Sequence, residues 1–126
     1  MSQILGLRTT IYKVNNLQAA IEWYTKAFET APYFNEPFYV GFNIAGYELG
    51  LLPDEDADTS SKSGNVITYW GVADIESEFK RFTDLGAEPN ETPENVGGDI
   101  ITASLKDPWN NVIGLIYNPE FSLDKV

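Results

Sequence analysis

A strand that runs into a helix is encoded by the sequence Val14-Asn15-Asn16-Leu17-Gln18-Ala19-Ala20-Ile21-Glu22-Trp23-Tyr24. The same pattern returns as Val72-Ala73-Asp74-Ile75-Glu76-Ser77-Glu78-Phe79-Lys80-Arg81-Phe82. Each copy follows an aromatic-rich strand and precedes a similar closing strand, Leu49-Gly50-Leu51 in the first half and Ile113-Gly114-Leu115 in the second. The chain therefore contains an internal repeat, and neither copy contains a histidine.

The first copy predicts a β-α-β-β-β unit. Residues 5–14 are rich in β-branched and aromatic side chains, which favours a strand. Asn16 is a good N-cap, and a helix ended by residues 30–32 follows it, with one apolar stripe of Leu17, Ala20, Ile21, Tyr24 and Phe28. Three short strands are expected over 33–34, 38–44 and 47–52, the last two joined by a turn at Ala45-Gly46.

The second copy predicts the same order of elements. A strand over 66–72 leads to a helix capped by Asp74, with Ile75, Phe79, Phe82 and Leu85 on one face and Gly86 as its stop signal. Strands are expected over 87–91, 99–106 and 112–117, with a turn over 107–111 and a turn or bulge at Gly97-Gly98. The fold class is therefore α+β, with two tandem βαβββ modules.

We expect one domain over residues 1–126, with modules at 5–53 and 65–119, a linker at 54–64 and a C-terminal tail at 120–126. Within the linker, Asp54, Asp56 and Asp58 alternate as in a calcium loop. Such a loop needs Gly at its sixth position and Glu at its twelfth, where this chain has Thr59 and Asn65. The segment is interpreted as a solvated linker.

Composition excludes several classes of function. The 126 residues carry 19 Asp and Glu against 8 Lys and Arg, a net charge of −11, which opposes binding to nucleic acid or anionic lipid. The chain has no cysteine, hence no disulfide or thiolate ligand. No apolar run is long enough to span a membrane, and the first residues do not resemble a signal peptide. The expected location is the cytoplasm.

Four pieces of the sequence carry a family resemblance: Val14-Asn15-Asn16-Leu17 with Trp23-Tyr24, Val72-Ala73-Asp74-Ile75, Leu85-Gly86-Ala87, and Asp107-Pro108-Trp109-Asn110-Asn111-Val112-Ile113-Gly114-Leu115. In this order the chain resembles the vicinal oxygen chelate superfamily, which includes glyoxalases, bleomycin-resistance proteins and extradiol dioxygenases. The resemblance spans roughly residues 5–118. It implies two βαβββ modules whose sheets form an open cup, usually within a homodimer.

The resemblance also implies where metal-dependent members place their ligands. Those positions fall on Thr9, about Gly50, Ile67 and Gly114, and none has the imidazole or carboxylate that a borderline divalent ion needs. A shift by one residue, to Thr10, Leu49, Thr68 or Ile113, supplies none either. The sequence therefore predicts neither metal nor cofactor, and argues against ring-cleaving dioxygenase and metal-dependent glyoxalase activity.

Strand alternation predicts which side chains line the cup. Tyr12 and Val14 should pack under the first helix, and Trp109 should close the rim. The two glycines of the set should leave space for a ligand, or else only relieve packing. The predicted ligand-binding residues are Thr9, Ile11, Lys13, Tyr39, Asn43, Glu48, Gly50, Ile67, Tyr69, Thr102, Ser104, Trp109, Gly114 and Ile116.

Three functions are compatible with such a cup. The favoured one is metal-independent binding of a small molecule, cationic and partly aromatic, because aromatic walls and negative charge both attract cations. The second is a metal-free lyase or isomerase, with Glu48 as the best candidate for a base and Lys13 at the same mouth. The third is a dimeric interaction module whose cup is vestigial. Residues 1–126 do not decide whether the protein is an enzyme, and no catalytic residue is assigned.

Overall fold

The computed structural model describes residues 7–54 and 66–121. They belong to two compact units, divided between residues 59 and 60. We call residues 7–54 the first unit and residues 66–121 the second unit. The start of the first predicted strand, most of the predicted linker and most of the predicted tail lie outside the described residues.

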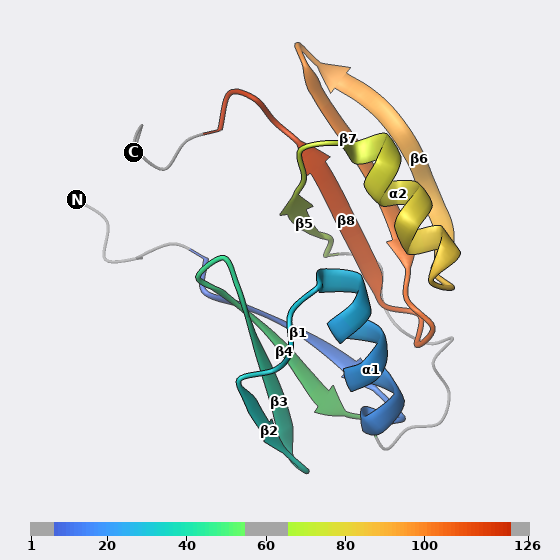
Figure 1. Cartoon of the computed structure of the whole chain (residues 1–126). Helices are drawn as coiled ribbons and strands as arrows, with labels where there is room; N and C mark the ends of the chain where they lie inside the picture. Colours follow the sequence, from blue (N-terminus) through green and yellow to red (C-terminus); the bar gives the residue numbers. More distant parts are fainter. Residues whose placement is uncertain (1–6, 55–65, 122–126) are drawn as a thin grey trace, which may run out of the picture. The chain divides into compact units, whose positions relative to one another are not determined.

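The first unit contains one helix and a four-stranded sheet, as predicted. Its sheet has the order β1-β4-β3-β2, with β1 parallel to β4 and the other pairs antiparallel (Figure 1). The elements are β1 (Thr9–Val14), α1 (Leu17–Phe28), β2 (Phe34–Glu36), β3 (Tyr39–Ile44) and β4 (Tyr47–Pro53). The parallel pairing of the first and last strands needs a crossover, and α1 lies in that crossover.

Local signals set the ends of these elements. The side chain of Asn16 accepts a hydrogen bond from the backbone N–H of Ala19 at 3.1 Å, which confirms the predicted N-cap. Helix α1 ends at Phe28 because Glu29 is left-handed, with φ 53°, so the stop comes just before the predicted Thr30-Ala31-Pro32. Ala45 and Gly46 both have positive φ, which is typical of a type I′ hairpin turn.

The core of the first unit lies between α1 and one face of its sheet. Tyr12 and Val14 are buried there, as predicted, and the ring of Tyr12 stacks on that of Tyr24 with centroids 5.7 Å apart. The same face contributes the fully buried residues Val40, Phe42, Leu49 and Leu51. We call the opposite face of each sheet, turned away from the unit's helix, the outer face.

The second unit repeats this topology with the order β5-β8-β7-β6. Its elements are β5 (Thr68–Gly71), α2 (Ile75–Asp84), β6 (Glu88–Gly97), β7 (Ile100–Lys106) and β8 (Val112–Tyr117). Strand β5 is shorter than predicted and β6 is twice as long, reaching Gly97 instead of Glu91. Residues 92–97 pair with β7 through register shifts, so the strand depends on its partner rather than on alternation within its own sequence.

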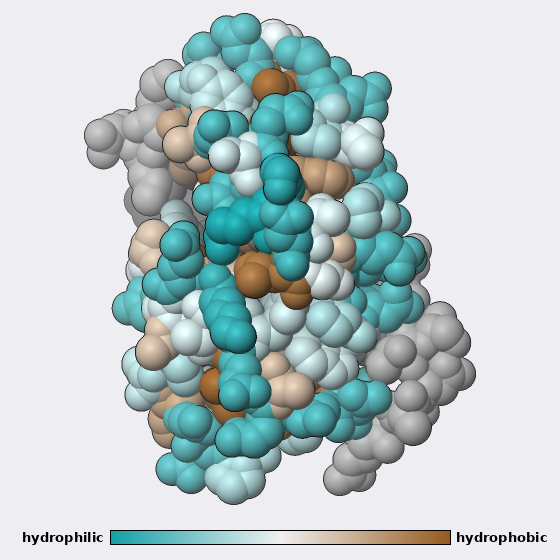
Figure 2. Space-filling model, turned by 45° about the vertical axis from the view of Figure 1, so that its right-hand side comes forward, coloured by the Kyte–Doolittle hydropathy of each residue, from teal (hydrophilic) through white to brown (hydrophobic). Residues whose placement is uncertain are grey.

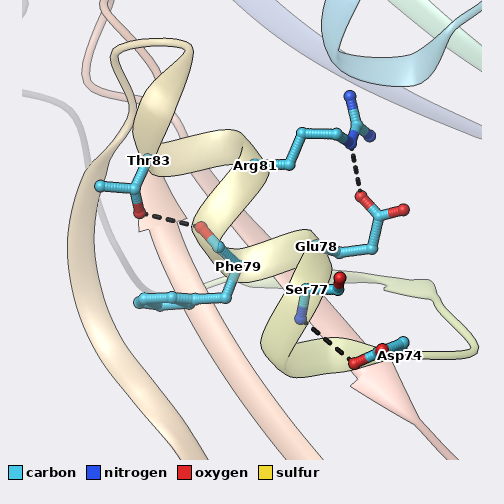
Figure 3. A network of polar contacts seen from close by, with 6 residues as sticks. All are labelled: Asp74, Ser77, Glu78, Phe79, Arg81 and Thr83. Carbon is cyan, nitrogen blue, oxygen red and sulfur yellow. Dashed lines mark hydrogen bonds and ion pairs between the residues drawn. The ribbon is translucent and has the colours of Figure 1, made fainter.

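Helix α2 is held by contacts along its own length (Figure 3). The Asp74 side chain accepts from the backbone N–H of Ser77 at 3.1 Å, and the Thr83 hydroxyl donates to the Phe79 carbonyl at 2.8 Å. Arg81 donates to Glu78 at 2.7 Å. Gly86 follows the helix with φ 106°, as predicted for its stop signal.

One face of the described residues is largely polar. Figure 2 shows a face on which hydrophilic residues predominate and hydrophobic ones form only small patches. Within residues 7–54 and 66–121, neither helix has the length and apolar content needed to cross a membrane.

Candidate functional site

The strand registers show which residues share the outer face of the first unit. Thr9 lies opposite Glu48, and Ile11 lies opposite Gly50, across the β1–β4 pair. Across the β3–β4 pair, Asn43 lies opposite Glu48. Because residues opposite one another point to the same side of a sheet, these five predicted residues share one face. Their buried neighbours in the sequence, such as Leu49, point to the other side, toward α1.

The centre of this outer face is the carboxylate of Glu48. The Tyr33 hydroxyl donates to its Oε1 at 2.7 Å, and the Tyr39 hydroxyl donates to its Oε2 at 2.6 Å. Distances of this length are those of charge-assisted O–H···O⁻ bonds. Both carboxylate oxygens are therefore held by phenols from the β2–β3 region, and the side chain is fixed in one orientation.

The backbone of the β2–β3 hairpin brings the two phenols to Glu48. The Tyr33 backbone N–H donates to the Gly41 carbonyl at 3.0 Å, which fixes the chain just before β2. Tyr39 begins β3, two residues before Gly41 on the same face. The two tyrosines thus approach Glu48 from either end of the hairpin.

Two glycines make room for this arrangement. A Cβ atom on Gly50 would lie 2.7 Å from Cε1 of the Tyr39 ring, and one on Gly41 would lie 2.7 Å from Oε2 of Glu48. Side chains at these positions would collide with the cluster. The expectation that Gly50 leaves space for a ligand is therefore wrong, since Tyr39 of the same sheet occupies that space. The alternative, that the glycine relieves packing, describes it better.

The cluster keeps both phenols protonated. The hydrogen bond to Glu48 raises the pKa of Tyr33 above its ordinary value, together with desolvation and the negative charge of the carboxylate. Burial raises the pKa of Tyr39 well above its ordinary value, and its bond to Glu48 acts in the same direction. Neither phenol is thus suited to act as a base near neutral pH.

A cavity of about 330 Å³ opens beside this cluster. Its lining residues are Arg8, Thr9, Tyr33, Asn43, Gly46, Tyr47 and Glu48. The sequence had indicated Thr9, Asn43 and Glu48, but not the other four. Tyr33 and Arg8 precede the regular strands, and Gly46 lies in a turn. Alternation could not place Gly46, and it put Tyr47 of β4, like Arg8 of the strand predicted over 5–14, on the face opposite to Glu48 and Thr9.

Lys13 lies on the same outer face but not at the same end. It is opposite Leu52, whereas Thr9 is opposite Glu48. Lys13 is four positions along the extended strand from Thr9, a distance on the order of 13 Å. The expectation that Lys13 shares a mouth with Glu48 is therefore wrong.

On the outer face of the second unit, Tyr69 lies opposite Gly114, Ser104 lies opposite Gly114, and Thr102 lies opposite Ile116. These residues share one face, as the predicted list required, and Ile67 lies just before β5. A Cβ on Gly114 would come within 2.6 Å of the Tyr69 ring. The space above Gly114 is thus also filled from within the sheet, contrary to expectation.

Two predicted residues of the second unit are not available to a ligand here. Ser104 is fully buried; it accepts a hydrogen bond from the Asn90 amide at 2.9 Å and donates one to Glu91 at 3.0 Å. Trp109, predicted to close the rim, is only 8% exposed. Its backbone N–H donates to the buried Asp107 carboxylate at 2.9 Å, which folds the turn inward.

The residues present do not fit a divalent metal ion. The positions implied by the family resemblance hold Thr9, Gly50, Ile67 and Gly114, and tyrosine rings cover both glycines. Within residues 7–54 and 66–121, no three His, Cys, Asp or Glu side chains gather as a metal site would require. Glu48 is a single carboxylate whose two oxygens already accept phenol protons.

The sequence model of the Glyoxalase/Bleomycin resistance protein/Dioxygenase superfamily matches residues 6–115. No curated protein sequence matches the chain. Among solved structures, the chain is similar to lactoylglutathione lyase from Agrobacterium tumefaciens, with 18% identity, a TM-score of 0.74, and coverage of 95% of this chain and 100% of that one.

Two further structures show the same fold. One is a glyoxalase-related enzyme from Fulvimarina pelagi, with 14% identity, a TM-score of 0.73, and coverage of 92% of this chain and 90% of that one. The other is the fosfomycin resistance protein FosX from Listeria monocytogenes, complexed with Mn(II) and sulfate, with 17% identity, a TM-score of 0.73, and coverage of 99% and 95%.

Proposed function

We propose that this chain, which belongs to the Glyoxalase/Bleomycin resistance protein/Dioxygenase superfamily, is a metal-independent binding protein for a small, cationic, partly aromatic molecule. The observation that carries the proposal is the Glu48 carboxylate, fixed by two tyrosines beside a cavity of about 330 Å³. The cavity is within the size range of small-molecule sites. Pairing of the two sheets into one cup stays a prediction from the sequence.

Charge and aromatic surface support a cationic ligand. Glu48 contributes a negative charge held at a fixed point, and the rings of Tyr33 and Tyr39 flank it. Tyr33 is 64% exposed, so its ring is accessible to a partner. Cations are attracted both by carboxylates and by the faces of aromatic rings. The net charge of −11 adds a weaker attraction of the same sign.

The two other functions considered from the sequence make different predictions. A metal-free lyase or isomerase would turn a ligand over, with Glu48 taking the proton. A dimeric interaction module would bind no small molecule at this cavity. Stabilisation by a ligand without turnover therefore distinguishes the proposed function from both.

The test is a thermal-shift screen with cationic aromatic compounds, including cationic antibiotics, followed by calorimetry on those that stabilise the protein. Glu48→Gln removes the charge but keeps the size of the side chain, and we expect it to weaken binding by about 10-fold or more. The control is Glu22→Gln, an equal change of charge on the exposed side of α1. Equal affinity in wild type and Glu48→Gln would contradict the proposal.

The assembly and location belong to the same proposal. We propose a homodimer, as the family resemblance implies, without a cofactor and in the cytoplasm. Sedimentation velocity tests the assembly, and a monomer across the measured concentrations would contradict it. Elemental analysis of the purified protein tests the metal claim, since a stoichiometric divalent ion retained after dialysis would contradict metal-independent binding.

A further inference from the structure

We propose that the group recognised at Glu48 is a cation with several N–H donors, a primary ammonium or an amidinium or guanidinium, and that a quaternary ammonium is discriminated against. The inference rests on the proposed function and narrows its ligand class. It follows from how the protons of the cluster are distributed.

Each phenol has a single proton, and both protons are already used. A tyrosine hydroxyl donates one hydrogen bond and accepts through its oxygen. The Tyr33 proton points at Oε1 of Glu48 and the Tyr39 proton points at Oε2. What the two hydroxyls can still offer a ligand is their oxygen lone pairs.

The carboxylate has acceptor capacity left. An ionised carboxylate has about four lone-pair sites, and the phenols occupy one on each oxygen. The cluster therefore presents a carboxylate and two phenol oxygens, all of them acceptors. A partner that also accepts, such as a carboxylate or a ketone, would meet lone pairs and negative charge.

Such a cluster is matched by a group that carries both positive charge and several protons. A primary ammonium has three N–H donors and an amidinium or guanidinium has donors arranged in a plane that suits a carboxylate. A quaternary ammonium has the charge but no N–H. It could approach the rings, yet it would leave the acceptors without hydrogen bonds.

The rest of the cavity lining contains one residue of the opposite charge, which bears on how a cationic ligand would be oriented. Arg8 is the only cationic residue among the lining residues and Glu48 is the only anionic one. A cationic group is therefore attracted toward Glu48 and repelled by Arg8. The uncharged part of the ligand can lie along Thr9, Asn43 and Tyr47.

The experiment compares five probes of similar size: benzylamine, benzamidine, benzyltrimethylammonium, benzyl alcohol and benzoate. Binding is followed through the backbone amide signals of Gly41, Glu48 and Gly50 in a two-dimensional NMR titration, with Gly114 of the second unit as an internal reference. We expect benzylamine and benzamidine to bind about 10-fold more tightly than benzyltrimethylammonium, since they add hydrogen bonds to a charged acceptor.

Variants test whether the acceptors cause this preference. In Glu48→Gln the amide introduces two donors, and we expect the preference for N–H cations to fall to about 2-fold or less. Glu22→Gln should keep it. Loss of the preference in Glu22→Gln, or its persistence in Glu48→Gln, would overturn the inference.

The outcomes separate the two proposals. If benzyltrimethylammonium binds at these amides as tightly as benzylamine, the cation is recognised by charge and rings alone; the inference fails and the proposed function stands. If benzyl alcohol or benzoate binds as tightly as the cations, or if no probe shifts these amides at millimolar concentration, both proposals fail.

Discussion

The two units share one topology but use their outer faces differently. In β4, Glu48 precedes Gly50 by two residues; in β8, the residue two before Gly114 is Val112. The first unit therefore has a carboxylate on its outer face, half-buried and held by two exposed or half-buried tyrosines. In the second unit the polar group at the centre of the sheet is Ser104, fully buried and held by Asn90 and Glu91.

This difference shows how a duplicated fold can carry different polar clusters at matching places. The strand parity is the same in both sheets, with a glycine opposite Gly41 in one and opposite Ser104 in the other. What differs is the group that holds a carboxylate: two phenols donate to the half-buried Glu48, whereas the buried Ser104 hydroxyl donates to the exposed Glu91.

The two central glycines should differ most in what they tolerate. A Cβ on Gly114 would meet the backbone carbonyl of Thr68 at 2.8 Å as well as the Tyr69 ring. The three atoms nearest to a Cβ on Gly50 all belong to the outer end of the Tyr39 side chain. That side chain can rotate away. We expect Gly114→Ala to lower the free energy of unfolding by roughly 2 kcal/mol and Gly50→Ala by about 1 kcal/mol.

Urea denaturation measures both values. Gly50→Ala should also displace Tyr39 from Glu48 and weaken ligand binding, whereas Gly114→Ala should leave the affinity at Glu48 unchanged. A larger loss of stability for Gly50→Ala than for Gly114→Ala would contradict this expectation. It would show that the Tyr39 ring is held as rigidly as the backbone.

The helix caps should show that the two units are alike away from their outer faces. Asn16 accepts from the Ala19 N–H and Asp74 accepts from the Ser77 N–H, both at 3.1 Å. We expect Asn16→Ala and Asp74→Ala each to cost about 1 kcal/mol of stability, measured by urea denaturation. Replacing either cap by Gly should lower the stability by only a few tenths of a kcal/mol. If removing the cap has no effect on stability in one unit, the two helix N-termini are not equivalent.

An alkaline titration should distinguish the tyrosines of the Glu48 cluster. Folding raises the pKa of Tyr33 and Tyr39 above the ordinary 10.0, so the stability that they contribute is complete below pH 10. It is lost as pH rises past 10 toward the folded-state values, since the unfolded phenols ionise first. Tyr33 and Tyr39 should therefore be among the tyrosines whose tyrosinate absorbance appears late in a titration of the folded protein.

The same titration in two variants locates the cause. Glu48→Gln should bring the pKa values of Tyr33 and Tyr39 closer to the ordinary range, because it removes the negative charge that opposes their ionisation. Glu91→Gln changes a carboxylate that a serine hydroxyl holds on the second unit, and should leave the titration of Tyr33 and Tyr39 unchanged. An identical curve for wild type and Glu48→Gln would contradict the described cluster.

Much of the fold could be predicted because it is encoded locally. The apolar spacing of α1, the caps Asn16 and Asp74, and the Ala45-Gly46 turn each depend on a few neighbouring residues. Strand β6 could not be predicted in full. Its residues 92–97 have no alternation and are ordered by irregular pairing with β7, which is a property of two segments together.

Only those residues of the candidate site that lie inside strands could be predicted, because alternation assigns each of them to one face of the sheet. Parity placed Thr9, Asn43 and Glu48 on one face correctly. It could not place Tyr33, which precedes β2 and reaches Glu48 across 15 positions of sequence. It also could not show that Ser104 and Trp109 are buried, because parity gives the side of a sheet and not what covers it.

The sequence by itself determined the repeat, the α+β class, the N-caps of both helices and the residue types at the four positions that the family resemblance implies. Those features depend on residue type and short-range spacing, which the chain carries whether or not it is folded. Only the tertiary structure decided that Tyr39 fills the space above Gly50, and that both phenols give their protons to Glu48. Such contacts join strands distant in sequence, and their geometry exists only once the strands have paired.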